Sequence, residues 1–183
     1  MKLHSLPVAQ LRRACLRRQG FSLVEILVGF ALIAVLLGTA NVLLFSALRS
    51  ARKASAVGIA KAEGAYALNA MAGTIKYARS IEACGANSVT IRRVNGHRVT
   101  YSLAGTGIAS ASADLPVPGL INLTSSRVVI STTGCAGGMF PACVPGSTGL
   151  TICFAADVAG ISQAGESGAV NFQTQVGLRN AGN

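Results

Sequence analysis

The sequence predicts an α+β fold in which a long N-terminal helix packs on a small antiparallel sheet. An apolar stretch occupies residues 21–45, and the Ala-rich, Pro-free stretch that follows keeps apolar side chains at helical spacing to residue 83. From residue 88 onward apolar and polar side chains alternate instead, which is typical of strands. The length of 183 residues fits one domain with additional segments.

Residues 1–20 are basic and contain no acid. The whole chain has 16 basic and 6 acidic residues, and therefore a net charge of +10. Without the five basic residues of this segment, the net charge of the remaining chain is 11 − 6 = +5. A basic segment directly before an apolar helix stays in the cytoplasm, which predicts export of everything after residue 45. The segment's charge therefore indicates topology rather than nucleic-acid binding. Its basic residues are Lys2, Arg12, Arg13, Arg17 and Arg18.

The apolar stretch 21–45 is long enough to cross a membrane. At about 1.5 Å per residue its 25 residues exceed a hydrocarbon core of about 30 Å. Glu25 lies inside it, and a charged side chain at the centre of a membrane helix costs roughly 2.5 to 3.5 kcal/mol. We therefore expect Glu25 to have a specific partner or task.

The helix is predicted to continue through residues 46–84 outside the membrane. Arg49, Arg52 and Lys53 follow the apolar stretch and suit interfacial anchors. A glycine inside a helix lowers the stability of the helix by about 1 kcal/mol relative to alanine. The helix is expected to contain three glycines, and each predicts close packing or a bend. These are Gly58, Gly64 and Gly73. The stripe expected to face the sheet is Val57, Ala60, Gly64, Leu68, Met71, Ile75 and Ala78.

Residues 85–183 are predicted to form the sheet. Asn95-Gly96 between two alternating segments predicts a hairpin over 88–103. Small residues with Pro116 and Pro118 predict a loop over 105–119. Further strands are expected at 127–133 and 150–155, and the last, 170–178, alternates most clearly.

Four cysteines outside the first segment predict disulfides in an oxidising compartment. Cys15 lies in residues 1–20, which leaves four cysteines, and four allow three pairings. The glycines between Cys135 and Cys143 favour a short ring there, with Cys84 joined to Cys153. Four buried free thiols are the alternative.

The motif Arg17-Arg18-Gln19-Gly20-Phe21-Ser22-Leu23-Val24-Glu25, followed by the apolar helix, resembles the class III signal of type IV pilins and pseudopilins. The resemblance implies a pilin-like fold. It also implies that a prepilin peptidase cuts between Gly20 and Phe21 and that Phe21 is N-methylated. Glu25, the fifth mature residue, is then placed to meet the amino group of a neighbouring subunit. Many type IV pilins have a Pro near mature position 22, whereas residues 39–43 here contain none.

The resemblance implies a location, partners and a division of the chain. The protein is expected in the bacterial inner membrane, with a cytoplasmic leader and a periplasmic head, and then in a pilus or pseudopilus. Its partners are other subunits of a helical filament, the peptidase and the assembly platform. The segments are 1–20, the cleaved leader; 21–45, the transmembrane and assembly half of the helix; 46–84, its periplasmic half; and 85–183, the head with its disulfide loop.

The resulting hypothesis is a structural subunit of a type IV pilus or of a type II secretion-like pseudopilus. The basic mature charge, the long leader and the C-terminal residues 172–180 look more like a minor subunit than an abundant one. The sequence holds two histidines and no CxxC pair, phosphate-binding loop or metal-binding spacing, so we expect no enzyme activity, catalytic residue, cofactor or metal.

Three alternatives remain. A DNA-contacting competence pilin could use Arg92, Arg93 and Arg98 of the hairpin, but no aromatic platform accompanies them, so nucleic acid is not the expected partner. A single-pass signal-anchored binding protein keeps Met1, and a secreted protein cut within residues 38–40 begins at Asn41. Both leave Glu25 unexplained, and the mature N-terminus separates them from a filament subunit beginning at Phe21.

Overall fold

The structure, a computed structural model, describes residues 20–112, 120–160 and 168–181. The predictions for the leader up to residue 19, for Cys15 and for Pro116 and Pro118 lie outside these ranges. By its contacts the chain divides into two compact units, one up to Leu44 and one from Phe45, and each is described by itself.

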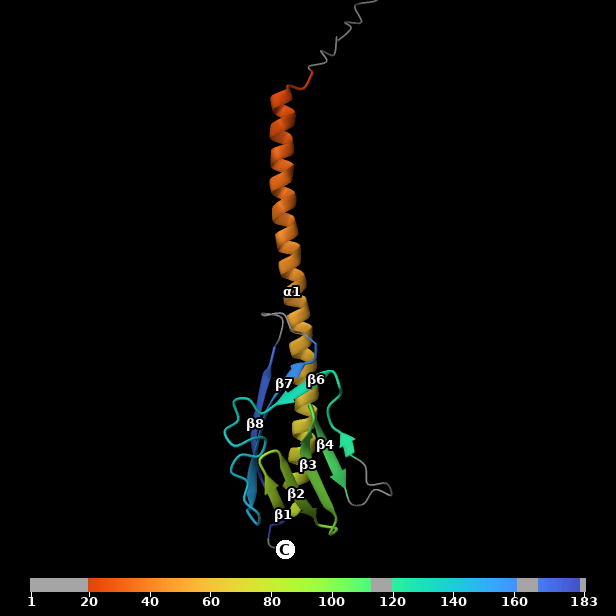
Figure 1. The fold of residues 1–183 in the computed structure, drawn as a ribbon, viewed down its shortest axis with the longest axis vertical. Coiled ribbons are helices and arrows are strands. Elements are labelled where there is room, and N and C mark those ends of the chain that lie inside the picture. Colours follow the sequence, from red (N-terminus) through yellow and green to blue (C-terminus); the bar gives the residue numbers. More distant parts are fainter. Residues whose placement is uncertain (1–19, 113–119, 161–167, 182–183) are drawn as a thin grey trace, which may run out of the picture. The chain divides into compact units, whose positions relative to one another are not determined.

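One long helix is followed by strands, which confirms the α+β prediction (Figure 1). The elements are α1 (Leu23–Lys76), β1 (Ala78–Gly85), β2 (Ser88–Arg93), β3 (Arg98–Ala104), β4 (Gly107–Ser112), β5 (Leu120–Asn122), β6 (Val128–Ser131), β7 (Gly149–Val158) and β8 (Val170–Gly177). All strand pairs are antiparallel. They form one sheet in the order β1-β2-β3-β4-β5 and a second in the order β6-β7-β8.

The second unit has one core shared by the helix and both sheets. Residues of α1 at helical spacing are buried: Ala56, Ala60, Gly64, Ala67, Met71 and Ile75. The predicted stripe is therefore largely right, although Val57 and Leu68 are only half-buried. A Cβ on Gly64 would lie 2.3 Å from the Phe172 ring, so the close packing expected at Gly64 is present. Gly58 and Gly73 have no such neighbour within 4 Å.

The predicted hairpin is confirmed as β2 and β3. Gly96 has a φ of 89°, a conformation that suits glycine, and the Asn95 side chain accepts a hydrogen bond from the His97 amide at 3.2 Å. Ile91 faces Val99 across the strand pair, and both are buried. The strands predicted near 127–133, 150–155 and 170–178 are present as β6, β7 and β8.

The helix ends earlier than predicted, and the assignment of residues 77–84 to it was wrong. It stops at Lys76, and residues 78–85 form β1, which pairs with β2. The C-terminal segment caps the helix end: the Arg179 amide donates to the Lys76 carbonyl at 2.8 Å, and the Asn180 side chain donates to the Tyr77 carbonyl at 3.3 Å. The boundary between helix and sheet therefore moves from residue 84 to residue 76.

The loop predicted for 105–119 also proved partly wrong, because residues 107–112 form β4. This strand pairs with β3 on one side and β5 on the other, and its Ile108 and Ala109 are buried. The amide of Ile108 donates to the Thr124 hydroxyl at 3.0 Å. Small side chains therefore belong here to a central strand rather than to a loop.

Candidate functional site

The predicted cleavage point lies just before the helix. Gly20 and Phe21 precede α1, and Phe21 is 76% exposed. A Cβ built on Gly20 would meet no atom within 4 Å. A peptide bond outside regular structure is open to a protease, whereas one inside a helix is held by hydrogen bonds. The Gly20–Phe21 bond therefore lies outside the hydrogen-bonded helix, between two exposed residues.

Ser22 lies at the N-cap of α1 and Glu25 lies in its first turn. The Ser22 carbonyl accepts hydrogen bonds from the amides of Glu25 at 2.9 Å and Ile26 at 3.2 Å, which puts Ser22 at the N-cap position and Glu25 third in the helix. Ser-x-x-Glu is the spacing of a capping box, and a carboxylate near a helix N-terminus interacts favourably with the helix dipole. The N-cap position of Ser22 was not predicted, although the Ser-x-x-Glu spacing indicates it.

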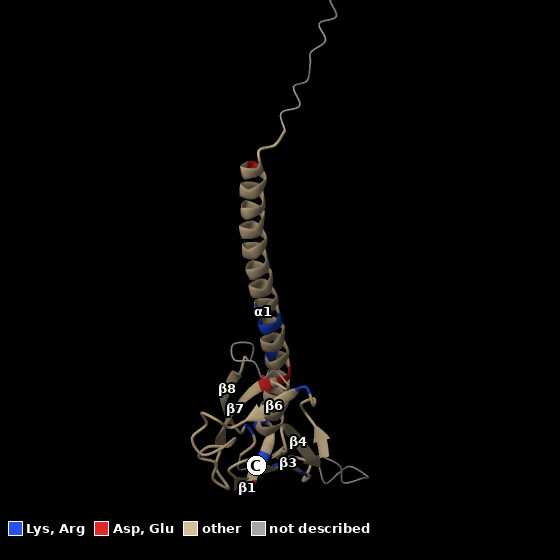
Figure 2. Cartoon of the chain, turned by 45° about the horizontal axis from the view of Figure 1, so that its top comes forward, with Lys and Arg blue, Asp and Glu red and all other residues tan. Residues whose placement is uncertain are grey.

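The helix beyond Glu25 exposes a long apolar surface. Residues 26–48 carry no charge, and large apolar side chains along this stretch are at least 47% exposed. Figure 2 shows this uncharged stretch in tan, between the acidic first turn and the first basic residues of α1. The side chains of Thr39 and Asn41 donate to carbonyls of their own helix at 2.9 Å. Such a surface is expected to contact lipid or partner helices, and the helix is long and apolar enough to cross a membrane.

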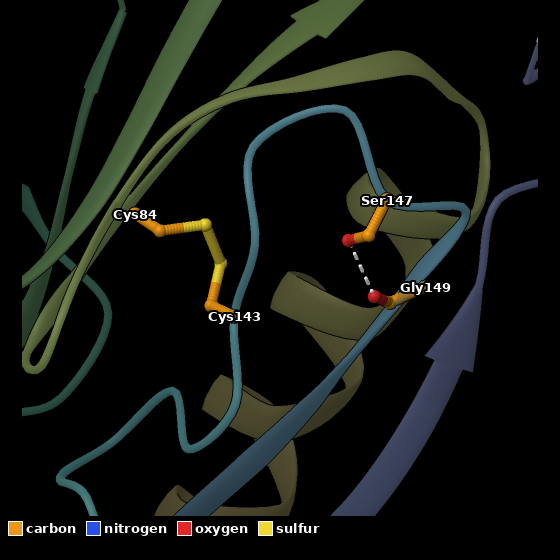
Figure 3. The surroundings of a disulfide bond; sticks show 4 residues. All are labelled: Cys84, Cys143, Ser147 and Gly149. Carbon is orange, nitrogen blue, oxygen red and sulfur yellow. Dashed lines mark hydrogen bonds between the residues drawn. A yellow bond between two sulfur atoms is a disulfide. The ribbon is translucent and has the colours of Figure 1, made fainter.

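The cysteines pair differently from the first-choice prediction. Cys84 of β1 bonds to Cys143, as Figure 3 shows, and Cys135 bonds to Cys153 of β7. The predicted disulfide between Cys135 and Cys143 was therefore wrong. The reason lies between these two residues, where Met139 and Phe140 are buried in the core.

Burial of that segment directs the two cysteines toward different sheets. The Phe140 amide donates to the Ala86 carbonyl beyond β1 at 3.1 Å, and the Met139 carbonyl accepts from the Cys153 amide of β7 at 2.9 Å. Gly138 has a φ of 91°, and a Cβ there would lie 2.3 Å from the Ala86 carbonyl oxygen, so this approach requires glycine. Residues 135–143 are thus covalently joined to both sheets.

Glu82 neutralises two of the three hairpin arginines. Arg92 donates through Nε to one carboxylate oxygen of Glu82, and Arg98 donates to the other at 2.6 Å. The contact of Glu82 with the hairpin was not predicted, because residue 82 was expected in the helix. The arrangement leaves only Arg93 of the three without a described acidic partner.

The Arg92 hydrogen bond is the main cause that holds the pKa of Glu82 below its usual value, with Arg98 contributing and partial desolvation opposing it. A lowered folded-state pKa stabilises the fold above the unfolded value of about 4.3, and this contribution is lost as pH falls through the folded pKa. We expect Glu82→Gln to reduce the loss of stability on acidification. Urea unfolding between about pH 3 and pH 7 measures this, and identical pH profiles for variant and wild type would contradict it.

Glu63 joins the helix to the segment after β5. Its two carboxylate oxygens accept hydrogen bonds from the Ser125 amide at 2.8 Å and the Ser125 hydroxyl at 2.6 Å. A charged acceptor makes such bonds stronger than neutral ones. Glu63 and Ser125 are 62 positions apart in the sequence, so sequence spacing does not predict their contact.

A family model, the prokaryotic N-terminal methylation motif, matches residues 15–41. No curated protein and no solved structure matches the chain. The matched segment contains Gly20, Phe21 and Glu25, so the chain carries the class III signal that type IV pilins and pseudopilins share. With its apolar helix and antiparallel sheets, it has the layout of a processed, pilin-like, single-pass membrane-anchored subunit.

Proposed function

We propose that the chain is a structural subunit, of the minor class, of a type IV pilus or a type II secretion-like pseudopilus. Residues 1–20 are removed by a prepilin peptidase, Phe21 is N-methylated, and the exported subunit joins the filament through its N-terminal helix. The observation that carries the proposal is Glu25, the single charge at the start of an exposed apolar surface, inside the matched motif.

The proposed task of Glu25 is to accept the amino group of a neighbouring subunit. Cleavage creates a positive charge at Phe21, and moving it into a bundle of apolar helices costs several kcal/mol unless a carboxylate offsets it. A subunit that provides both groups at one end of its helix can repeat head to tail without closing, which builds a filament.

This role accounts for more observations than the alternatives. A signal-anchored or secreted protein gives no reason for a carboxylate in this position. DNA contact as a competence pilin has less support, because Glu82 already neutralises Arg92 and Arg98. The proposed partners are the other subunits, the peptidase and the assembly platform of the inner membrane, and the proposed role is structural rather than enzymatic.

Glu25→Gln tests the docking role directly. Glutamine suits the same third helical position as glutamate, but it has no charge to offset the neighbour's amino group. We expect the variant to be cleaved and inserted normally. Its amount in sheared filaments should be at least about tenfold lower than that of the wild type, which corresponds to a loss of about 1.4 kcal/mol of docking free energy. The measurement compares cleavage, membrane content and filament content when the variant is expressed with the wild-type filament partners.

Two controls separate charge from helix capping. Glu25→Asp keeps the charge on a shorter side chain and should retain part of the filament content. Ser22→Ala removes the capping hydroxyl but keeps Glu25, and it should assemble. If Glu25→Gln enters filaments at the wild-type level, the carboxylate has no docking role, and contact with lipid head groups explains it instead.

A further inference from the structure

A groove lies where the end of α1 meets the turn between β2 and β3. It is lined by Gly73, Thr74, Tyr77, Arg93, Val94 and Asn95. The largest apolar side chains, Tyr77 and Val94, are 55% and 62% exposed. Exposed apolar side chains gathered in a hollow are typical of a docking surface rather than of a core.

One cation lies in the groove lining, and two more lie beside its Tyr77 ring. Nζ of Lys76 lies 6.0 Å from the centre of the Tyr77 ring, and Cζ of Arg179 lies 5.9 Å from it. Arg93 forms part of the groove lining. The ion pairs of the described residues involve Glu82 with Arg92 and Arg98 and none of these three cations. The groove therefore combines an aromatic surface with uncompensated positive charge.

Gly73 keeps the groove open. A glycine inside a helix lowers helix stability relative to alanine, so it usually has a packing reason. Gly64 has one, because a Cβ there would overlap the Phe172 ring. A Cβ on Gly73 would meet nothing within 4 Å, so packing within the chain does not require glycine. A longer side chain at this lining position therefore has open space beside the groove and can narrow it.

A second copy of this chain is a poor occupant for the groove. The described acids of the second unit are already engaged: Glu63 by Ser125, Glu82 by two arginines, and Asp157 by the backbone amides of Val158 and Gly168. Without residues 1–20 the chain still has a net charge of 11 − 6 = +5, so two copies repel each other electrostatically.

We propose that this groove docks a segment of a different protein, in which an acidic side chain stands next to an aromatic or aliphatic one. The apolar side chain packs between Tyr77 and Val94, and the carboxylate faces Arg93 of the lining. Lys76 and Arg179 add positive charge beside the Tyr77 ring. Complementary charge sets the choice of partner, and the buried apolar anchor supplies most of the affinity. The inference does not depend on filament assembly.

The test uses the full chain in detergent and a fluorescent peptide that alternates Asp and Phe. Fluorescence anisotropy should show binding to the wild type. Gly73→Leu should weaken it at least about tenfold by filling the groove, and Arg93→Ser should weaken it by a similar factor at low salt. Gly58→Leu is the matched control: it is also an exposed helix position with open surroundings, lies outside the groove lining and should bind like the wild type.

Two further peptides test the chemistry of the occupant. A peptide of alternating Asp and Ser lacks the apolar anchor, and one of alternating Lys and Phe reverses the charge; both should bind at least about tenfold more weakly than the first. Circular dichroism of each variant checks that the fold is retained, and Arg93→Ser provides the test should Gly73→Leu unfold. Absence of wild-type binding, equal binding of the Asp–Ser peptide, or full binding by folded Gly73→Leu would overturn the proposal.

Discussion

Gly20→Val is expected to leave the chain as an uncleaved membrane precursor, with processing reduced to near zero. The peptidase must bring its catalytic groups against the backbone on both sides of the Gly20–Phe21 bond. Glycine has no Cβ to obstruct this approach, whereas valine adds a branched side chain next to the bond. The chain itself tolerates the change, because a Cβ on Gly20 meets no atom within 4 Å. The loss therefore reflects recognition rather than misfolding.

Co-expression with a prepilin peptidase and separation of precursor from product by mass measures this effect. Gly38→Val is the matched control, since Gly38 lies within α1, also has no neighbour within 4 Å of a Cβ, and is remote from the cleavage point in sequence. Cleavage of Gly38→Val with retention of the Gly20→Val precursor supports the assignment. Cleavage of Gly20→Val at the wild-type rate contradicts it.

Removing the disulfide between Cys84 and Cys143 is expected to cause the largest loss of stability. Its cysteines are 59 residues apart, whereas those of the second disulfide are 18 apart. Closing the longer loop restricts the unfolded chain more. The longer loop therefore stabilises the fold by about 4 kcal/mol, and the shorter loop by about 3 kcal/mol. Either value is a large part of the free energy of unfolding of a typical domain, which is about 5–15 kcal/mol.

Urea unfolding of the double variants Cys84→Ala/Cys143→Ala and Cys135→Ala/Cys153→Ala compares the two bonds. The first should unfold at the lower urea concentration, and both should unfold before the wild type. Mass mapping without reduction should recover peptides linked as Cys84–Cys143 and Cys135–Cys153. A Cys135–Cys143 link, or four cysteines that alkylate in the native exported protein, would refute this pairing.

The parts of the fold that were predicted correctly have strong local patterns. The apolar stretch before residue 45, the Asn95-Gly96 turn and the alternation of β8 each specify structure over a few neighbouring residues. Residues 78–85 carry no such pattern, because their Ala, Arg and Glu residues also suit a helix. Their conformation follows from pairing with β2 and from the C-terminal segment that caps Lys76, contacts that are remote in sequence.

The cysteine pairing was missed for the same reason. Nearness in sequence favoured Cys135 with Cys143, but burial of Met139 and Phe140 between the sheets decided the outcome. The candidate site itself could be predicted, since Gly20, Phe21 and Glu25 lie within six consecutive residues of a linear motif. Contacts that require the folded chain, such as those of Glu63 and Glu82, could not.

Determining the N-terminal residue of the mature protein, isolated from membranes that contain a prepilin peptidase, tests the proposed function most directly. Mass spectrometry of the N-terminal peptide should find a chain that begins at Phe21 and carries one added methyl group on its amino nitrogen. A mature chain that still begins at Met1 indicates a signal anchor, and one that begins at Asn41 indicates a secreted protein; either result contradicts a filament subunit.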